Sequence, residues 1–473
     1  METSILTVLI LIIGFYMAWN IGANDVSNAM GTSVGSRALS LRRAVILAGI
    51  LEFCGAYFVG ENVSETMERG LVNPEIFIHQ PLILVLGMCG ALLGTGFWLQ
   101  LASYLKWPVS TTHAIVGAII GFGIVAGGFD AILWKETTII AISCVISPLI
   151  SAVISYTIFS VVQKKILYAM DPIEATRRAV PLFFFIVFMT FTLSLMTNGL
   201  QNLHLQISFA GALGISFVVG LVAAGISYLV MQKISLPNSY IQPVGRHSPQ
   251  TVISLDKAIK HLQRVRVSSL DETHTKISEI LQDVKSLSRK LREETNFGHR
   301  ASEYQFAEKV FVYLQIISAC YVAFAHGAND VANAIGPVAA VLGILNNGYI
   351  TETSIVPPWL LALGGVGIVI GLATWGWRVM ETIGKKITEL TPTRGFCAEF
   401  GAATTILVAS KLGLPISTTH CLVGAVLGVG LARGISALNL GMLREIVLSW
   451  IVTIPASAGM SILCFYILKA IFI

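Results

Sequence analysis

Long apolar stretches separated by short polar ones dominate the chain. Most are close to 20 residues, the length at which an α-helix crosses the hydrocarbon core of a bilayer. The pattern predicts twelve apolar helical segments, near residues 4–30, 43–60, 82–106, 109–127, 131–163, 181–198, 208–231, 309–341, 358–379, 396–411, 415–432 and 445–471. An all-α integral membrane protein is therefore the expected fold class.

Two sequence motifs occur twice, in the same order. GANDVSNAMG at 22–31 matches GANDVANAIG at 327–336 in eight of ten positions. PVSTTHAIVGAIIGFG at 108–123 matches PISTTHCLVGAVLGVG at 415–430 in ten of sixteen. The two offsets are 305 and 307 residues, so the chain contains an internal duplication.

Loop charges predict that the two copies face opposite sides of the membrane. The loop at 37–43 contains three arginines, whereas the matching loop at 344–358 contains no Lys or Arg. The next loop is acidic at 61–80 in the first copy and basic at 378–394 in the second. Because basic loops favour the cytoplasm, we expect inverted-topology repeats with both termini outside.

The polar Ser-Thr-Thr-His sequences interrupt apolar segments and predict re-entrant hairpins. Three full crossings, or one crossing plus a hairpin with its tip at Pro108, both fit the predicted sides of the flanking loops. The hairpin is favoured, because a polar tip within the membrane is tolerated where it lines a site. The second copy predicts a matching hairpin at Pro415.

Residues 232–305 are the one strongly charged region, with 12 basic and 8 acidic residues. We expect this insert to be cytoplasmic, with an amphipathic helix at 277–291 that contacts the membrane or a partner, or only links the repeats. The predicted organisation is a first repeat (1–165), a two-helix membrane hairpin (166–231), the cytoplasmic insert (232–305) and a second repeat (306–473).

Composition supports a membrane protein and excludes a soluble one. The chain is 55% hydrophobic and only 12% charged, where soluble proteins carry about 25% charged residues. Its seven cysteines show no metal-ligand spacing, which favours packing roles. Basic cytoplasmic loops account for the formal charge of +5, so no nucleic-acid partner and no cofactor are expected.

Each GAND motif places a carboxylate inside an apolar segment, where a charge is costly and usually functional. Gly22 and Gly327 can break the helix and expose backbone carbonyls, which with carboxylate and amide oxygens would suit a small hard cation. Close helix packing is the alternative reading of these glycines. The predicted cation ligands are Asn24, Asp25, Asn329 and Asp330.

Each STT sequence follows a proline and begins a glycine-rich apolar helix. Unpaired N–H groups and the positive end of a helix dipole suit an oxyanion, and hydroxyls add donors without adding charge. The alternative is that the hydroxyls bond to carbonyls of their own helices. The predicted anion-binding residues are Ser110, Thr111, Thr112, Ser417, Thr418 and Thr419.

Glu52 and Glu399 are further acidic residues in apolar surroundings and could join cation sites or have neutralised structural roles. An intramembrane hydrolase with a Ser110–His113–Asp25 triad is disfavoured. Ser and His three residues apart on one helix are poorly placed for a nucleophile–base bond, and no GxSxG motif is present. We therefore expect no enzyme.

The paired GAND and STTH motifs, together with the insert, resemble those of the inorganic phosphate transporter family. That family includes sodium–phosphate symporters and bacterial low-affinity phosphate permeases. The resemblance implies two re-entrant hairpins, a homodimer, cations near the GAND residues and phosphate at the STT residues. Glu399, in a GFxxE context, resembles a functional family position, and aligning 87–91 with 395–399 places Ala91 opposite it.

The expected function is import of inorganic phosphate by cation symport in the cell membrane. Sodium is favoured because the Asn-Asp sets supply hard oxygen ligands. Proton coupling or metal-phosphate transport stays open, because the family includes both. Sulfate, another tetrahedral oxyanion, would also suit hydroxyl and N–H donors.

Overall fold

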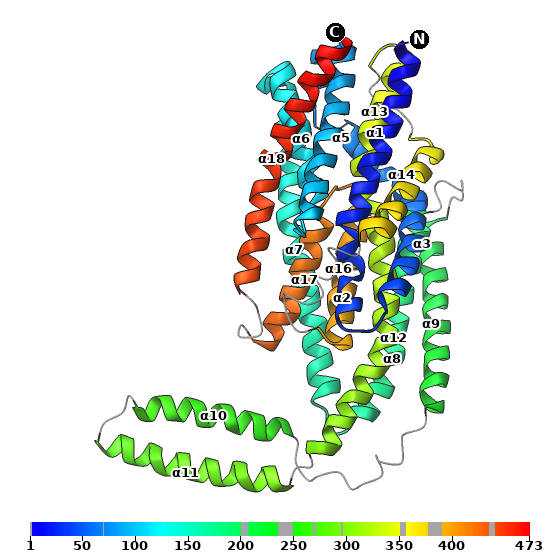
Figure 1. Ribbon diagram of the computed structural model, residues 1–473. Coiled ribbons are helices and arrows are strands. Elements are labelled where there is room, and N and C mark those ends of the chain that lie inside the picture. The colour runs from blue at the N-terminus through cyan, green and yellow to red at the C-terminus, as the bar shows by residue number, and fades with distance from the viewer. Residues whose placement is uncertain are drawn as a thin grey trace. The chain divides into compact units, whose positions relative to one another are not determined.

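Helices make up nearly all of the backbone in the computed structural model (Figure 1). In the described part of the chain, the β-structure is limited to an isolated bridge between Val72 and Ile132. The structure describes residues 2–69, 71–199, 207–234, 249–267, 271–294, 297–350, 356–376, 390–434 and 440–473.

The chain forms two compact units, which are treated separately below. The first contains Met1–Ser160, Phe184–Ala223 and Phe311–Ile473, and the second contains Val161–Phe183 and Ala224–Val310. All predicted motif residues lie in the first unit.

Each of the twelve predicted apolar segments coincides, over its described residues, with a helix or with consecutive helices; residues 377–379 of the segment 358–379 lie outside the described part of the chain. Among the described residues, eight helical stretches are long and apolar enough to cross a membrane. The helices of the first copy are α1 (Glu2–Asn24), α2 (Val26–Gly35), α3 (Leu41–Val59), α4 (Glu61–Arg69), α5 (Pro81–Tyr104), α6 (Thr111–Gly127) and α7 (Trp134–Val162). Those of the second copy are α12 (Phe297–Asp330), α13 (Ala332–Asn347), α14 (Pro358–Gly371), α16 (Pro392–Lys411), α17 (Thr418–Arg433) and α18 (Leu440–Phe472).

Short 3-10 and π-helical turns extend or connect these elements. The intervening helices are α8 (Pro172–Ser194), α9 (Phe209–Lys233), α10 (Pro249–Val267) and α11 (Asp271–Glu294). The short turns are η1 (Pro74–Phe77), η2 (Phe129–Ala131), η3 (Gln163–Leu167), η4 (Leu195–Gly199) and η7 (Leu372–Gly376).

The two STT-containing helix pairs enter the first unit from opposite ends. In Figure 1, α5 and α6 occupy its upper part and α16 and α17 its lower part, while both chain termini lie at the top. Each pair turns through a residue with positive φ, Lys106 at 60° and Gly413 at 65°. Equivalent turns at equivalent positions are what a duplication requires.

Each helix pair packs against the last helix of the other repeat. The α5–α6 pair lies on α18, where a Cβ on Gly94 would come 2.4 Å from the backbone nitrogen of Ser461. The α16–α17 pair lies on α7, where a Cβ on Gly424 would come 2.3 Å from the carbonyl oxygen of Pro148. Glycine is required at both positions because any side chain would separate the helices.

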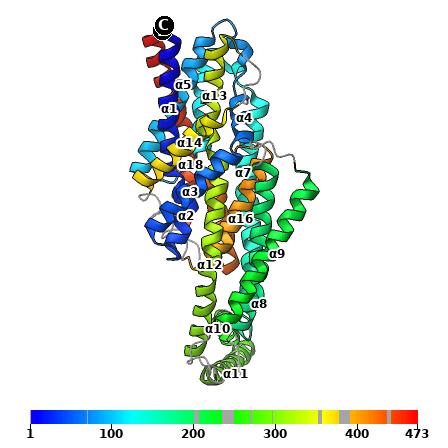
Figure 2. The same cartoon turned by 90° about the vertical axis from the view of Figure 1, so that its right-hand side faces the viewer.

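The GAND glycines serve close packing rather than helix breaking. Helical structure continues through Gly22 and Gly327, and the interruption falls later, where α1 meets α2 and α12 meets α13. Figure 2 shows α1 above α2 and α13 above α12. A Cβ on Gly22 would lie 1.9 Å from the carbonyl oxygen of Ile368, and one on Gly327 would lie 2.1 Å from that of Glu52. The expected helix break at these glycines is therefore wrong, and their role is to let α14 and α3 approach.

In the second unit, α10 and α11 lie side by side as a helical hairpin (Figure 1). The Ser288 hydroxyl donates to Asp256 at 3.0 Å, and Leu281 and Leu291 are buried. Ile280 and Leu287 of the same helix are exposed. The insert thus contains two paired helices where the sequence predicted one.

Candidate functional site

In each repeat, a threonine at the start of the Gly-rich helix bonds to the GAND carboxylate. Thr111 Oγ1, at the start of α6, donates to Asp25 Oδ2 at 2.6 Å. Thr418 Oγ1, at the start of α17, donates to Asp330 Oδ2 at 2.7 Å. All four residues are buried. The two motifs of each repeat, whose bonded residues are 86 and 88 positions apart, therefore form one local site.

The tips of the two hairpins also bond to each other. Thr112 Oγ1 donates to the carbonyl oxygen of Ile416 at 2.9 Å, and Thr419 Oγ1 donates to that of Val109 at 3.2 Å. These bonds are reciprocal, because the partners are related by the 307-residue offset. Thr419 Oγ1 also lies 3.4 Å from Asp25 Oδ1. The two local sites consequently meet as one buried centre.

The serines of both STT sequences cap their helices. Ser110 Oγ accepts from the backbone N–H of His113, and Ser417 Oγ accepts from that of His420, both at 3.2 Å. The helix starts predicted from the Pro-Ser-Thr pattern are confirmed.

The GAND asparagines connect each motif to its own hairpin. Asn24 Nδ2 donates to Ser103 Oγ at 3.0 Å and to the carbonyl oxygen of Trp107 at 3.2 Å. The Asn329 amide contacts Ser410 Oγ at 3.2 Å, the equivalent contact in the second repeat. Both amides therefore have a positioning contact, besides their predicted role as cation ligands.

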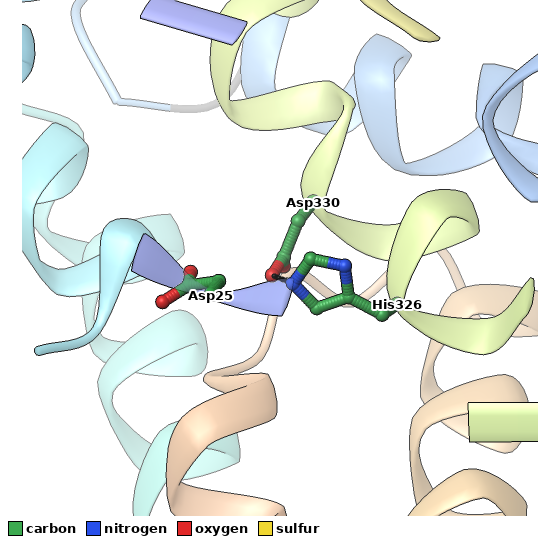
Figure 3. A group of neighbouring side chains, drawn as sticks. All are labelled: Asp25, His326 and Asp330. Carbon is green, nitrogen blue, oxygen red and sulfur yellow. Dashed lines mark ion pairs between the residues drawn. The ribbon is translucent and has the colours of Figure 1, made fainter. Parts of the chain in front are cut away.

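A histidine that the sequence reasoning missed lies at the centre. His326 Nε2 is 2.8 Å from Asp330 Oδ2, and Nδ1 is 3.2 Å from Glu52 Oε1. Ligand atoms of Asp25, His326 and Asp330 all lie within 4.8 Å of one another (Figure 3). Two carboxylates from different repeats are thus close enough to share a small cation.

This histidine makes the two repeats chemically unequal. The residue equivalent to His326 in the first repeat is Ile21. Gly327 and Gly22 pack in the same way against Glu52 and Ile368, so Ile368 is the counterpart of Glu52. The buried acid–imidazole contact therefore exists in one repeat only. The sequence does show this difference between the repeats, because the second repeat reads AHGAND at 325–330 where the first reads NIGAND at 20–25.

Glu399 forms a separate buried site. It does not join the Asp25–His326–Asp330 group, and it accepts hydrogen bonds from four neutral side chains. Its counterpart in the first repeat is Ala91 by the alignment of 87–91, or Leu92 by the 307-residue offset, and is apolar either way. The donors are Thr32 (2.6 Å), Ser33 (2.7 Å), Gln315 (3.1 Å) and Ser318 (2.5 Å).

Comparison with known proteins identifies the family of this chain. The phosphate transporter family matches residues 21–461. A suggested phosphate permease of Chlamydia pneumoniae is 45% identical over 99% of both chains. The chloroplastic inorganic phosphate transporter 2-1 of Arabidopsis thaliana is 41% identical over all of this chain and 73% of its own length.

A solved structure extends the comparison to three dimensions. A sodium-dependent phosphate transporter superposes with a TM-score of 0.76 at 37% identity, covering 99% of this chain and 100% of its own. Transport, rather than catalysis, is the activity of this family. With a family match across nearly the whole chain, and with both duplicated motifs meeting in one buried centre, the chain belongs to the phosphate transporter family.

Proposed function

We propose that the protein imports inorganic phosphate together with sodium, and that the buried centre is its substrate site. The observation that carries this proposal is the meeting of two STT helix N-termini beside two carboxylates, Asp25 and Asp330. This arrangement supplies anion donors and cation ligands within one site. The proposed phosphate ligands are Ser110, Thr111, Thr112, Ser417, Thr418 and Thr419.

The anion would be held by hydroxyls and helix N-terminal N–H groups. Both are good donors to oxyanions, and the two helix dipoles add a favourable field. The hydroxyls of Thr111 and Thr418 now donate to carboxylates, so phosphate would have to displace these bonds. The donors are neutral hydroxyls rather than Lys or Arg side chains, which suits a substrate that must also leave.

The charges of the site explain why phosphate and cation transport would be coupled. An anion beside Asp25 and Asp330 is strongly repelled in a buried, low-dielectric site unless cations offset the carboxylates. Phosphate and cation would therefore bind together and dissociate together. Sodium is the proposed cation because the donor set consists mainly of hard oxygens, with Asn24 and Asn329 completing it.

Proton coupling is the second candidate, and the contact of His326 with Glu52 favours it. An imidazole between two buried acids is a suitable carrier of a proton. Sulfate remains the competing anion, since it accepts the same hydrogen bonds.

The remaining proposals concern the setting of the transporter. We propose a multi-pass protein of the cell membrane, with both termini outside and residues 232–305 in the cytoplasm. Lipid would surround the long apolar helices, whose many exposed aliphatic side chains support that assignment. A homodimer is proposed from the family resemblance.

Reconstitution into proteoliposomes tests the function. Sodium and proton gradients are imposed separately while uptake of labelled phosphate is followed. Uptake driven by the inward sodium gradient alone is expected. Uptake driven only by the proton gradient would replace sodium with protons, and no phosphate uptake under either gradient would contradict the proposal.

A further inference from the structure

Asn333 reaches from the second repeat to the hairpin tip of the first. It lies near the start of α13, three residues after Asp330, and its side chain is 1% exposed. Its Nδ2 donates to Thr111 Oγ1 and to Thr112 Oγ1, both at 3.3 Å. It thereby contacts two of the hydroxyls that we assign to phosphate.

The other end of the same amide is unsatisfied. Asn333 Oδ1 is buried and has no hydrogen-bond partner among the described residues. A buried acceptor without a donor costs on the order of 1–3 kcal/mol, a cost that a bound donor at this position would relieve. This acceptor lies on the amide that faces the STT tip, which otherwise offers mainly donors.

We propose that Asn333 Oδ1 accepts a hydrogen bond from the hydroxyl of protonated phosphate and so selects phosphate over sulfate; this rests on the proposed function. Near neutral pH, phosphate keeps at least one O–H, whereas sulfate has none. Hydroxyl and N–H donors cannot distinguish the two anions. An acceptor can, because it bonds the phosphate O–H and repels a sulfate oxygen.

Two variants isolate the acceptor. Asn333→Leu removes both ends of the amide at similar volume, whereas Asn333→Asp loses the Nδ2 donor but keeps an acceptor oxygen. Uptake of labelled phosphate gives its half-saturating concentration, and competition gives inhibition constants for arsenate, which carries a proton like phosphate, and for sulfate. The half-saturating sodium concentration is measured in parallel.

In Asn333→Leu we expect phosphate and arsenate to weaken by about tenfold to a hundredfold relative to sulfate, as the loss of one charge-assisted hydrogen bond implies. Asn333→Asp should keep the wild-type preference for phosphate and arsenate over sulfate. Asn20→Leu is the matched control. Asn20 is also buried with an unpartnered Oδ1, and its Nδ2 donates to the carbonyl oxygen of Tyr16 in its own helix, at 2.9 Å.

An unchanged phosphate-to-sulfate ratio in Asn333→Leu would overturn the proposal. Equal loss of the ratio in Asn333→Asp would also overturn it, because the acceptor would then be irrelevant. A raised half-saturating sodium concentration at an unchanged ratio would make Asn333 a cation ligand instead. If Asn333→Leu fails to insert, Asn333→Asp still tests the proposal. Loss of the preference for phosphate and arsenate over sulfate in that variant would contradict it. Failure of the proposed function is distinct, because the wild type would then not take up phosphate.

Discussion

At the scale of single residues, the site owes its chemistry to carboxylates that bond to hydroxyls. Asp25 accepts hydrogen bonds from Thr111 and Thr419, whereas Asp330 accepts one from Thr418 and lies 2.8 Å from His326 Nε2. The two aspartates are thus equivalent in sequence but not in surroundings. Removing the charge of either aspartate should end coupling of phosphate uptake to the cation. Only the removal at Asp330 also disturbs a contact with a second buried ionisable group, His326.

We expect Asp25→Asn and Asp330→Asn each to cripple cation-coupled uptake while the protein still inserts. Asp330→Asn should also lower the thermal unfolding temperature more, because it weakens the buried contact with His326. Uptake and unfolding in detergent measure the two effects. Glu174→Gln is the control, since its exposed ion pair with Arg178 contributes little. Wild-type coupling in either aspartate variant would show that carboxylate to be structural.

Thr111→Val and Thr418→Val should each raise the half-saturating phosphate concentration by roughly tenfold to a hundredfold, as one hydrogen bond to a charged group contributes about 1.5–3 kcal/mol. Valine keeps the shape and removes the hydroxyl, which in Thr111 also accepts a hydrogen bond from Asn333 Nδ2. Thr157→Val serves as the control, because its hydroxyl bonds to its own helix at Val153 on an exposed face. Unchanged affinity in both variants would move the phosphate site away from the STT tips.

At the scale of helices, glycine-lined crossings hold the two hairpins in place. Gly424→Ala should destabilise the protein by about 1–3 kcal/mol, because its Cβ would collide with the carbonyl of Pro148 and push α17 from α7. Gly214→Ala in α9 is the control, since nothing lies within 4 Å of its Cβ. Thermal unfolding in detergent compares the two. Equal unfolding temperatures of Gly424→Ala and Gly214→Ala would mean that the α17–α7 crossing accommodates a methyl group without loss of stability.

The sequence predicted the helices and the motifs better than their contacts. Apolar length and the Pro-Ser-Thr starts were sufficient to locate the helices, including α6 and α17. The contact of His326 with Glu52 joins residues 274 positions apart, and no local pattern indicates such a pair. The glycines were misread because helix breaking and close packing share one sequence signal, which only a neighbour such as Ile368 resolves.

At the scale of the whole molecule, orientation in the membrane is the property that loop charge predicts. We expect cysteines placed at Arg42 and Lys385 to react from the cytoplasm, and one at Glu65 to react from outside. Labelling with an impermeant maleimide in cells and in inverted vesicles measures this; Lys385 lies outside the described residues. The unmodified protein gives the background, which should be low because its own cysteines are all buried or half-buried.

A cysteine at Glu65 that reacts only from the cytoplasm would overturn the inverted arrangement. Labelling of Arg42 and Lys385 from opposite sides would do the same, because inversion requires both on one side. The sequence boundaries of the two repeats, at 165 and 306, stay a prediction that this mapping would help to test.

The packing of each hairpin on the other repeat constrains how the chain is made. The α5–α6 hairpin leaves the ribosome roughly 330 residues before α18, which at about 5–20 residues per second is a wait on the order of 15–70 s. During that time its glycine face lacks α18, whereas its tip has its bonds to Asp25 and Asn24 of the same repeat, so we expect the translocon or a chaperone to shelter the glycine face. A nascent chain truncated before α18 should therefore be recognised as incompletely folded, even though all of its first repeat has been synthesised.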